Sequence, residues 1–314
     1  MRGFVNSIPK DVLYITGLIF AVLILATLVI FLLEKFNKRL DLSEIKARTK
    51  SWWVMASVFI IATLFIDEIS YLAFALLSFA ALRELYSILD LRLSDRRTIF
   101  WAYLSVPIQF YLAYIEWYGA FIIFIPVVMF LWLPFRLVLT GDMKGNVRSM
   151  SILQWALMLT VFSPSHLAYL LSLPEIEGFK AGGRGLLLFL VFLTEINDVL
   201  QFVWGKLIGK HKIIPKVSPN KTWEGFLGGF FSTIAIGYGL SFLTPLTELQ
   251  VIFVSAMIAF SGFVGDVVVS SIKRDIGIKD TGTSIPGHGG ILDRIDSLAY
   301  TAPVFFHLVY YLAY

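Results

Sequence analysis

Hydrophobic residues dominate this chain in long, nearly uncharged runs that short polar loops separate. Ten runs can be distinguished, at residues 12–33, 51–66, 69–89, 98–115, 118–139, 151–173, 185–205, 225–243, 249–272 and 295–313. A helix needs roughly 20 apolar residues to cross the hydrocarbon core of a bilayer, and only the second run is clearly shorter. The pattern predicts an all-α, polytopic integral membrane protein with about ten transmembrane helices.

The composition agrees with this prediction. Only 15% of the 314 residues are charged and 58% are hydrophobic, whereas soluble domains are nearer a quarter charged. The chain contains no cysteine. Disulfides and thiolate metal sites are therefore excluded, and a metal would need oxygen or histidine ligands.

Lysines and arginines are concentrated in alternate loops. Loops 34–50, 83–97, 136–148, 206–221 and 273–294 carry 22 of the 26 basic residues. Because such loops stay on the cytosolic side, the pattern predicts five cytosolic loops and both termini on the non-cytoplasmic side. In a bacterium this means the inner membrane. The basic loops also attract anionic membrane lipids, and no nucleic-acid partner is expected.

The two parts of the chain differ in character. Residues 1–184 form apolar runs with few internal charges, which predicts a set of N-terminal transmembrane helices. Residues 185–314 carry polar groups within the runs and in both cytosolic loops, which predicts a catalytic region within one integrated membrane domain. No internal repeat is evident, so the inverted-repeat plan of many transporters gains no support.

The first polar cluster, Thr194 to Asp198, lies inside the seventh run. A carboxylate at membrane depth costs about 2.5–3.5 kcal/mol, so it is seldom kept without a use. Glu195 and Asp198 are three residues apart and share a helix face. The cluster is either a buried hydrogen-bond network or the lining of a polar cavity, and the polar clusters that follow favour the cavity.

The second cluster is the loop from Gly205 to Gly225, GKLIGKHKIIPKVSPNKTWEG. It is not a Walker A loop, because its glycines are one residue too close and His211 replaces the magnesium-binding hydroxyl. Two prolines stiffen it, which a loop serving topology alone does not need. Its hydroxyls and lysines before a new helix predict a phosphate site. The candidate residues are Lys206, Lys216, Ser218, Asn220, Lys221 and Thr222.

The third cluster begins in the ninth run and ends in GHGGILDRID, Gly287 to Asp296. Asp266 and Lys273 are two helical turns apart and share a face, as do Asp293 and Asp296 if a helix begins near Ile291. The glycine-rich turn leaves backbone N–H groups open to an anion. Aspartate oxygens suit a hard cation such as Mg²⁺.

Four further residues of this segment are candidate substrate contacts: Arg274, His288, Gly289 and Arg294. His166 and His307 lack polar company and are expected to be structural. Oxygen ligands, cationic donors and open backbone amides together predict chemistry on phosphates by positioning and charge stabilisation.

At these residues the sequence resembles a known family. Ser270 to Arg274 reads SSIKR, Lys279-Asp280 follows, and Pro286 to Asp296 reads PGHGGILDRID. This 27-residue pattern resembles the signature of the phosphatidate cytidylyltransferases, the CDP-diacylglycerol synthases. Asp198 and the loop from Gly205 to Gly225 are similar to the family as well, so the resemblance covers about residues 195–300.

The resemblance implies an integral membrane enzyme that transfers CMP from CTP to phosphatidic acid at the cytosolic face. The products would be CDP-diacylglycerol and pyrophosphate. It also implies a homodimer, with Mg²⁺ as cofactor and K⁺ as a second cation.

The resemblance also implies individual roles. Asp266 and Asp293 match the family's metal-binding aspartates, and Lys273 and Arg274 match its phosphate-contacting basic pair. Asp296 matches the acid three residues on. The catalytic residues expected on this basis are Asp266, Lys273, Asp293 and Asp296, with Asp198 among the substrate-binding residues.

One position departs from the family pattern. Where most members have glutamate four residues before the signature lysine, this chain has Val269. Two alternatives therefore stay open. The chain is a divergent member acting on another acidic phospholipid or nucleotide, or it is a non-enzymatic lipid-binding or transport protein. A transporter, however, needs no glycine-rich turn beside paired aspartates and a stiff lysine-rich loop.

Overall fold

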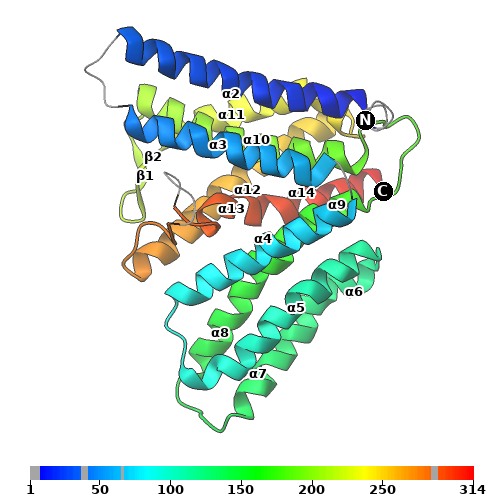
Figure 1. The fold of residues 1–314 in the computed structure, drawn as a ribbon, viewed down its shortest axis with the longest axis vertical. Coiled ribbons are helices and arrows are strands. Elements are labelled where there is room, and N and C mark those ends of the chain that lie inside the picture. The colour runs from blue at the N-terminus through cyan, green and yellow to red at the C-terminus, as the bar shows by residue number, and fades with distance from the viewer. Residues whose placement is uncertain (1–7, 37–41, 65–66, 284–288) are drawn as a thin grey trace.

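A computed structural model gives the fold of the chain and describes residues 8–36, 42–64, 67–283 and 289–314. Most of these residues are helical. Figure 1 shows the helices α2, α3, α10 and α11 toward one end, α12 and α14 in the middle beside α4 and α9, and α5 to α8 toward the other end.

The helices up to residue 171 form the first group along the chain. The group consists of α2 (Lys10–Phe36), α3 (Ser43–Leu64), α4 (Asp67–Ile88), η1 (Leu93–Asp95), α5 (Arg96–Tyr114), α6 (Tyr118–Ile123), η2 (Phe124–Met129), α7 (Phe130–Val138), α8 (Asn146–Leu157), η3 (Met158–Phe162) and α9 (Ser163–Leu171). The segments α6 to α7 and α8 to α9 are continuous helices with a π-helical insert. Pro126 lies within one insert and Pro164 lies two residues after the other. Proline lacks the N–H that a regular helix needs, so a widened turn is favoured near these positions.

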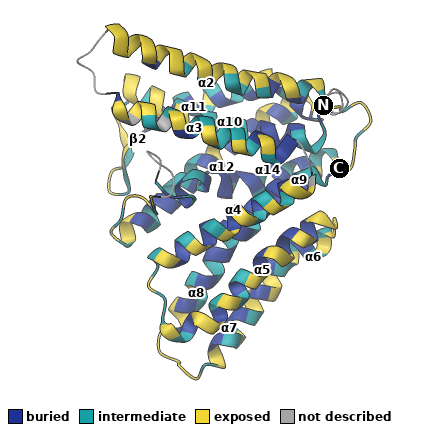
Figure 2. Cartoon of the chain, viewed as in Figure 1, coloured by how far each residue is buried: buried dark blue, intermediate teal, exposed yellow. Residues whose placement is uncertain are grey.

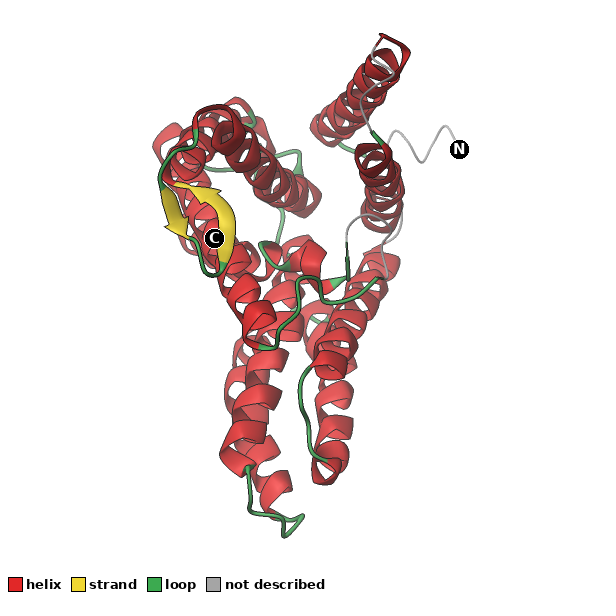
Figure 3. Ribbon diagram, turned by 90° about the vertical axis from the view of Figure 1, so that its left-hand side faces the viewer, coloured by secondary structure: helices red, strands yellow, loops and turns green. Residues whose placement is uncertain are grey.

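The second group along the chain contains helices and a small hairpin. It consists of α10 (Gly182–Ile208), β1 (Lys212–Ile214), β2 (Ser218–Thr222), α11 (Trp223–Gly239), η4 (Ser241–Leu243), α12 (Glu248–Asp275), α13 (Leu292–Ile295) and α14 (Leu298–Ala313). The strands β1 and β2 pair antiparallel, with Lys212 opposite Thr222. Figure 3 shows this hairpin against a molecule that is otherwise helical in its described parts.

The prediction of an all-α architecture is confirmed apart from this hairpin. Each of the ten apolar runs lies in one or more helices. In the described ranges, five helical segments are long and apolar enough to cross a membrane: Lys10–Phe36, Glu68–Ile88, Tyr118–Val138, Gly182–Ile208 and Glu248–Asp275. The second run is part of a longer helix than expected, because α3 begins at Ser43 inside the predicted loop 34–50. The number of crossings and the side of each terminus stay predictions.

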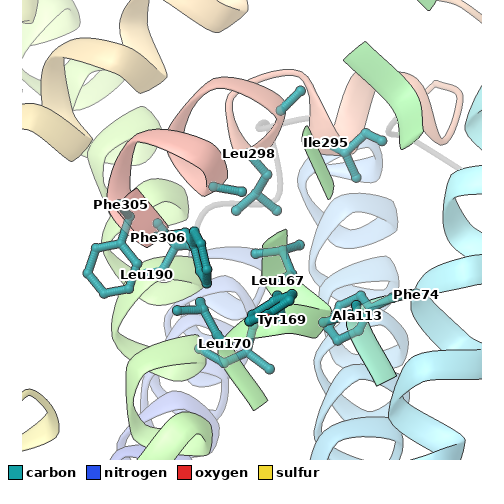
Figure 4. Packing of buried hydrophobic residues seen from close by; sticks show 14 of the residues in the cluster. Phe74, Ala113, Leu167, Tyr169, Leu170, Leu190, Ile295, Leu298, Phe305 and Phe306 are labelled. Atoms are coloured by element: carbon teal, nitrogen blue, oxygen red, sulfur yellow. The ribbon is translucent and has the colours of Figure 1, made fainter. Parts of the chain in front are cut away.

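The buried apolar side chains form one cluster that joins early and late helices. Figure 4 shows Tyr169 of α9 between Phe74 of α4 on one side and Phe305 and Phe306 of α14 on the other. The cluster thus includes residues on both sides of position 184. In contrast, α2 exposes most of its apolar side chains, as Figure 2 shows, and such a surface suits contact with lipid.

A buried acid fixes the start of α5 against α8. Asp95 is fully buried, and it accepts hydrogen bonds from Arg92 Nη2 at 2.7 Å and from Ser149 Oγ at 2.7 Å. Arg92 also donates to Asn146 Oδ1 at 2.7 Å. Burial opposes ionisation of Asp95, but the hydrogen bonds from Arg92 and Ser149 outweigh it, so the pKa of Asp95 lies below its usual value. This contact joins the turns at one end of the helices.

Candidate functional site

Three aspartates from separate segments come together where α10, α12 and the turn after α13 meet. They are Asp198 on α10, Asp266 on α12 and Asp296 directly after α13, and the three carboxylates are close enough for their charges to interact. Ser297 Oγ donates to Asp198 Oδ2 at 2.8 Å, which connects α10 to this turn. Asp198 Oδ1 is buried without a hydrogen-bond partner in the described structure. The carboxylates therefore retain capacity to bind a cation or a donor.

Positive groups lie beside these aspartates. Lys221 Nζ on β2 is 2.6 Å from Asp266 Oδ2, and its other neighbour is the ring of Phe263, at 4.9 Å from the centroid. Ser270 Oγ donates to Asp266 Oδ1 at 3.1 Å. Arg294 lies near enough to interact electrostatically with Asp198, and its Nε is buried without a described partner. Acidic and basic groups thus lie beside one another in this region.

A buried ion pair lies on the next turns of α12. Lys273 Nζ is 2.7 Å from Asp293 Oδ1, and the two side chains are only 10% and 3% exposed. The other oxygen, Asp293 Oδ2, accepts from Thr281 N at 2.8 Å and from Gly290 N at 2.9 Å, and Thr281 Oγ1 lies 3.0 Å from it. Burial opposes ionisation of Asp293, but Lys273 and these N–H groups outweigh it, so the pKa of Asp293 lies below its usual value.

The glycine-rich turn fits around the same carboxylate. Gly289 has φ +82°, and a Cβ built there would lie 2.5 Å from Asp293 Oδ2. Only a glycine allows both this backbone conformation and this approach. The turn that the sequence predicted as an anion site therefore uses the N–H of Gly290 on Asp293 in this structure.

The lysine-rich segment forms the β1–β2 hairpin, and side chains at both of its ends hold it. Arg274 Nε on α12 donates to the carbonyl oxygen of Val217 at 3.3 Å. At the base of the hairpin, Glu224 accepts from Lys210 N at 3.0 Å and from His211 N at 3.2 Å, and it contacts His211 Nδ1 at 2.5 Å. The hydrogen bonds from the Lys210 amide and the His211 ring lower the pKa of Glu224 to about 2. Stiffness, predicted from the two prolines, is thus supported by specific contacts.

The predicted substrate residues of this segment have different surroundings. Lys221 is half-buried and faces Asp266, and Ser218 is half-buried in β2. Lys206, Lys216 and Asn220 are exposed, and Lys206 Nζ lies 5.7 Å from the centroid of the Phe202 ring. Thr222 is buried, and its hydroxyl accepts from Gly225 N at 3.1 Å as the N-cap of α11. Its hydroxyl is therefore used by the fold itself.

Two expectations about helix faces are refined by the structure. Asp266 and Lys273 lie on the same helix, as expected, but Asp266 contacts Lys221 whereas Lys273 contacts Asp293. The expected helix near Ile291 is present as the single turn α13. His288 lies outside the described residues. Val269, at the position of the usual glutamate, is only 2% exposed and belongs to the apolar core.

A carboxylate that the sequence analysis did not select also reaches this region. Glu84 on α4 accepts a hydrogen bond from Ile291 N at 2.9 Å, although the two residues are 207 positions apart. The only signal in the sequence is an acid near the end of an otherwise apolar run. Thr281, which contacts both Glu84 and Asp293, carried no signal at all.

The donor set suits a hard cation in its chemistry. Asp198, Asp266 and Asp296 offer carboxylate oxygens, which are the ligands that Mg²⁺ prefers, and Asp198 Oδ1 has no other described partner. Among the residues that the structure describes, no three acidic or histidine side chains are already gathered at the spacing of a metal site. Cation binding would therefore require small side-chain movements within this cluster.

Apolar helices that enclose clustered aspartates and lysines define a membrane protein with a polar, phosphate-compatible site. Comparison with known proteins makes this class specific. The model of the cytidylyltransferase family matches residues 46–312, so the chain belongs to that family.

Several known proteins are similar to the chain. YnbB of Escherichia coli K12, whose function is described as uncharacterized, is 42% identical over 298 residues, which is 94% of this chain and 97% of that protein. A phosphatidate cytidylyltransferase of Staphylococcus haemolyticus is 32% identical over 182 residues, or 52% of this chain and 70% of that protein. One from Staphylococcus aureus is 35% identical over 127 residues, covering 40% of this chain and 49% of that protein.

Proposed function

We propose that the chain transfers CMP from CTP to phosphatidic acid. An oxygen of the lipid phosphate attacks the α-phosphorus of CTP, a new phosphoanhydride bond forms, and the bond from the α-phosphorus to the bridging oxygen breaks. Pyrophosphate leaves with the electron pair, and the lipid product is CDP-diacylglycerol. The second pKa of a phosphate monoester is about 6, so the nucleophile is already anionic at neutral pH and needs no strong base.

One observation carries this proposal. Lys221, Asp266, Lys273, Asp293 and Asp296 come from segments far apart in the sequence, yet they form two adjoining charge clusters around α12. A membrane scaffold has no need of such an arrangement, because each buried charge must be offset by others. A reaction between two polyanionic substrates needs both cations on phosphates and acids that hold a metal.

The residues have four proposed roles. Lys221, Lys273, Arg274 and Arg294 bind and orient the phosphates, together with the exposed Lys206 and Lys216. Ser218, Asn220, His288 and Gly289 add hydrogen bonds from the hairpin and the glycine-rich turn. Asp198 and Asp296 keep these cations in position, and Thr222 acts by shaping the start of α11.

Mg²⁺ is the proposed cofactor, and K⁺ a second cation. Asp266 and Asp293 would hold Mg²⁺, with Asp198 and Asp296 supplying further oxygens nearby. When bound, Mg²⁺ would offset the negative charge of the leaving pyrophosphate. Asp266 is the more accessible of the two proposed ligands, because its side chain is 27% exposed whereas that of Asp293 is 3% exposed.

The proposed setting is the cytosolic face of a membrane crossed about ten times, with both termini on the other side. In this topology CTP enters from the cytosol and the lipid enters sideways from the bilayer. Residues 1–184 would form the N-terminal helices and residues 185–314 the catalytic region of one membrane domain, and the protein would be a homodimer. A single cysteine introduced at Asn220 should react with membrane-impermeant thiol reagents only from the cytosolic side; labelling from outside would reject this topology.

A second candidate is supported by Val269. A buried apolar side chain stands where most members have a carboxylate, and the relative that covers nearly the whole chain is named as uncharacterized. The same transfer chemistry on another acidic phospholipid, or with another nucleotide, is therefore the alternative. A non-enzymatic lipid-binding or transport role would leave the two charge clusters without a use.

The test is transfer of label from radioactive CTP to lipid by purified protein with Mg²⁺. Phosphatidic acid is compared with other acidic phospholipids, and Asp266→Asn with Glu248→Gln, an exposed acid at the other end of the same helix. The proposal expects labelled CDP-diacylglycerol from the native chain and from Glu248→Gln, and none from Asp266→Asn. Label in another lipid supports the second candidate, and no labelled lipid from folded protein refutes both enzymatic readings.

A further inference from the structure

Among the described acids of α4, Glu84 is the one that contacts Thr281 and the start of α13, Ile291 and Leu292. Its Oε2 accepts from Ile291 N at 2.9 Å. Its Oε1 accepts from Leu292 N at 3.0 Å and from Thr281 Oγ1 at 2.5 Å. Both carboxylate oxygens of Glu84 thus accept hydrogen bonds from residues about two hundred positions later in the chain. In Figure 1 the end of α4 and α13 lie side by side.

Two glycines make room for this carboxylate. A Cβ built at Gly290 would lie 2.1 Å from Glu84 Oε1, and one built at Gly282 would lie 3.1 Å from Glu84 Oε2. The last two glycines of the GHGG motif are therefore required by two different contacts. Gly289 accommodates Asp293, and Gly290 accommodates Glu84.

Glu84 also completes the start of α13. This single helical turn has no capping side chain of its own. Backbone N–H groups at a helix start need acceptors, and Glu84 supplies them for Ile291 and Leu292. Since Asp293 is the next residue, the same contact fixes the direction in which its side chain points.

A continuous chain of contacts connects Glu84 to the buried ion pair. Thr281 Oγ1 lies within hydrogen-bond distance of both Glu84 Oε1 and Asp293 Oδ2. Asp293 Oδ1 in turn contacts Lys273 Nζ. A side chain with two acceptor oxygens suits this end of the chain of contacts, because the Ile291 and Leu292 amides and the Thr281 hydroxyl are all donors.

We propose that Glu84 is a positioning residue that holds residues 281–283 and 289–292, and through them Asp293 and Lys273, in the geometry of the active site. The structural part of this inference stands on the contacts alone. Its effect on catalysis rests on the proposed function, CMP transfer to phosphatidic acid. The N-terminal helices then contribute directly to the site instead of serving only as a membrane anchor.

The test uses three variants and one spectroscopic probe. Glu84→Gln keeps the size but turns an N–H₂ group toward a backbone donor, and Glu84→Asp keeps the charge on a shorter side chain. Glu68→Gln is the matched control, because Glu68 is an exposed acid on the same helix. The chain contains no cysteine, so Thr283→Cys gives a single site for a nitroxide label next to the contact. Electron paramagnetic resonance then reports the mobility of this segment without any need for activity.

The expected result has two parts. In Glu84→Gln the nitroxide line shape narrows, and kcat per folded molecule falls at least about tenfold, while KM for CTP changes less than about threefold. Glu84→Asp recovers part of both properties, and Glu68→Gln matches the native chain. A residue that only supports overall stability would change the folded fraction and leave kcat per folded molecule unchanged.

The contrary outcomes are distinct. If Glu84→Gln and Glu84→Asp fold and their line shapes equal that of the native chain, the inference is refuted. If Glu84→Gln does not fold, Glu84→Asp decides in the same way. If the native chain forms no CDP-lipid at all, the proposed function fails, and the line shapes still decide whether Glu84 holds the segment.

Discussion

Removal of the positive charge from the Lys273–Asp293 pair is the most direct test of how this site is held together. The change is Lys273→Met, which keeps the apolar stem and deletes the ammonium group. The Asp293 side chain, which is only 3% exposed, then lacks the ammonium group of Lys273. Breaking a buried pair at one partner typically costs about 3–5 kcal/mol. Asp293 keeps the backbone N–H groups of Thr281 and Gly290 as donors, so we expect the lower end, about 3 kcal/mol.

The assay is the free energy of unfolding in mixed detergent micelles, followed by tryptophan fluorescence. The native chain, Lys273→Met, Asp293→Asn and the double variant form a double-mutant cycle, and the coupling energy should be about 1–3 kcal/mol. Lys180→Met removes an exposed lysine and should change stability by less than about 0.5 kcal/mol. A cost below about 1 kcal/mol for Lys273→Met, or no measurable coupling, would show that the two groups are not paired in the folded protein.

Three further changes test other parts of the fold and the site. Gly289→Ala should lower stability and abolish CMP transfer, because the new Cβ would clash with Asp293. Gly277→Ala is the control: Gly277 has φ +76° and no neighbour within 4 Å, so this change should cost only about 1–2 kcal/mol of backbone strain. Equal losses of activity in the two variants would reject the steric argument. The pKa of Asp95 is lowered on folding, so its contribution to stability is complete above its usual pKa of 3.8 and is lost as pH falls through the lower folded value. Melting temperatures between pH 6 and pH 3 should therefore fall less steeply for Asp95→Asn than for the native chain. Parallel curves would contradict this. Chelation of divalent cations should stop CMP transfer and added Mg²⁺ should restore it, and transfer that continues in excess chelator would exclude a magnesium role.

The helices could be predicted from the sequence because their signal is local. Long apolar runs without charges have few alternatives to membrane helices, and each run is helical in the structure. The hairpin could not be predicted in this way. Residues 218–222, SPNKT, have neither hydrophobic alternation nor β-branched enrichment, so the strand forms through its pairing with residues 212–214 and its contacts with α12.

The candidate site was predictable in its composition but not in its pairings. Spacing on a helix indicates which residues share a face, and it led to Asp266, Lys273, Asp293 and Asp296. Which partner each residue contacts depends on how distant segments pack. Asp266 contacts Lys221, 45 positions earlier in the chain, and Glu84 contacts the turn before Asp293. Periodicity within one segment carries no information on such contacts.

Hydrogen-bond satisfaction separates the buried acids of this protein into two kinds. Asp95, Asp293 and Glu84 have donors on both carboxylate oxygens, and each joins segments that are distant in the chain. Such acids stabilise the fold, and replacing them should cost stability as well as function.

Asp198 and Asp296 are of the other kind, and Asp266 lies beside them, although Ser270 and Lys221 reach its two oxygens. They lie close enough to repel one another, and Asp198 Oδ1 has no described partner. Mutual repulsion and an unsatisfied oxygen both oppose folding, so packing alone gives no reason to gather these three acids. Lys221 and Arg294 offset part of the negative charge. A site that must receive a cation together with polyphosphate has to keep such groups available before the substrates arrive. The uncompensated acids therefore mark where binding takes place, and the fully hydrogen-bonded acids mark what holds that place in shape.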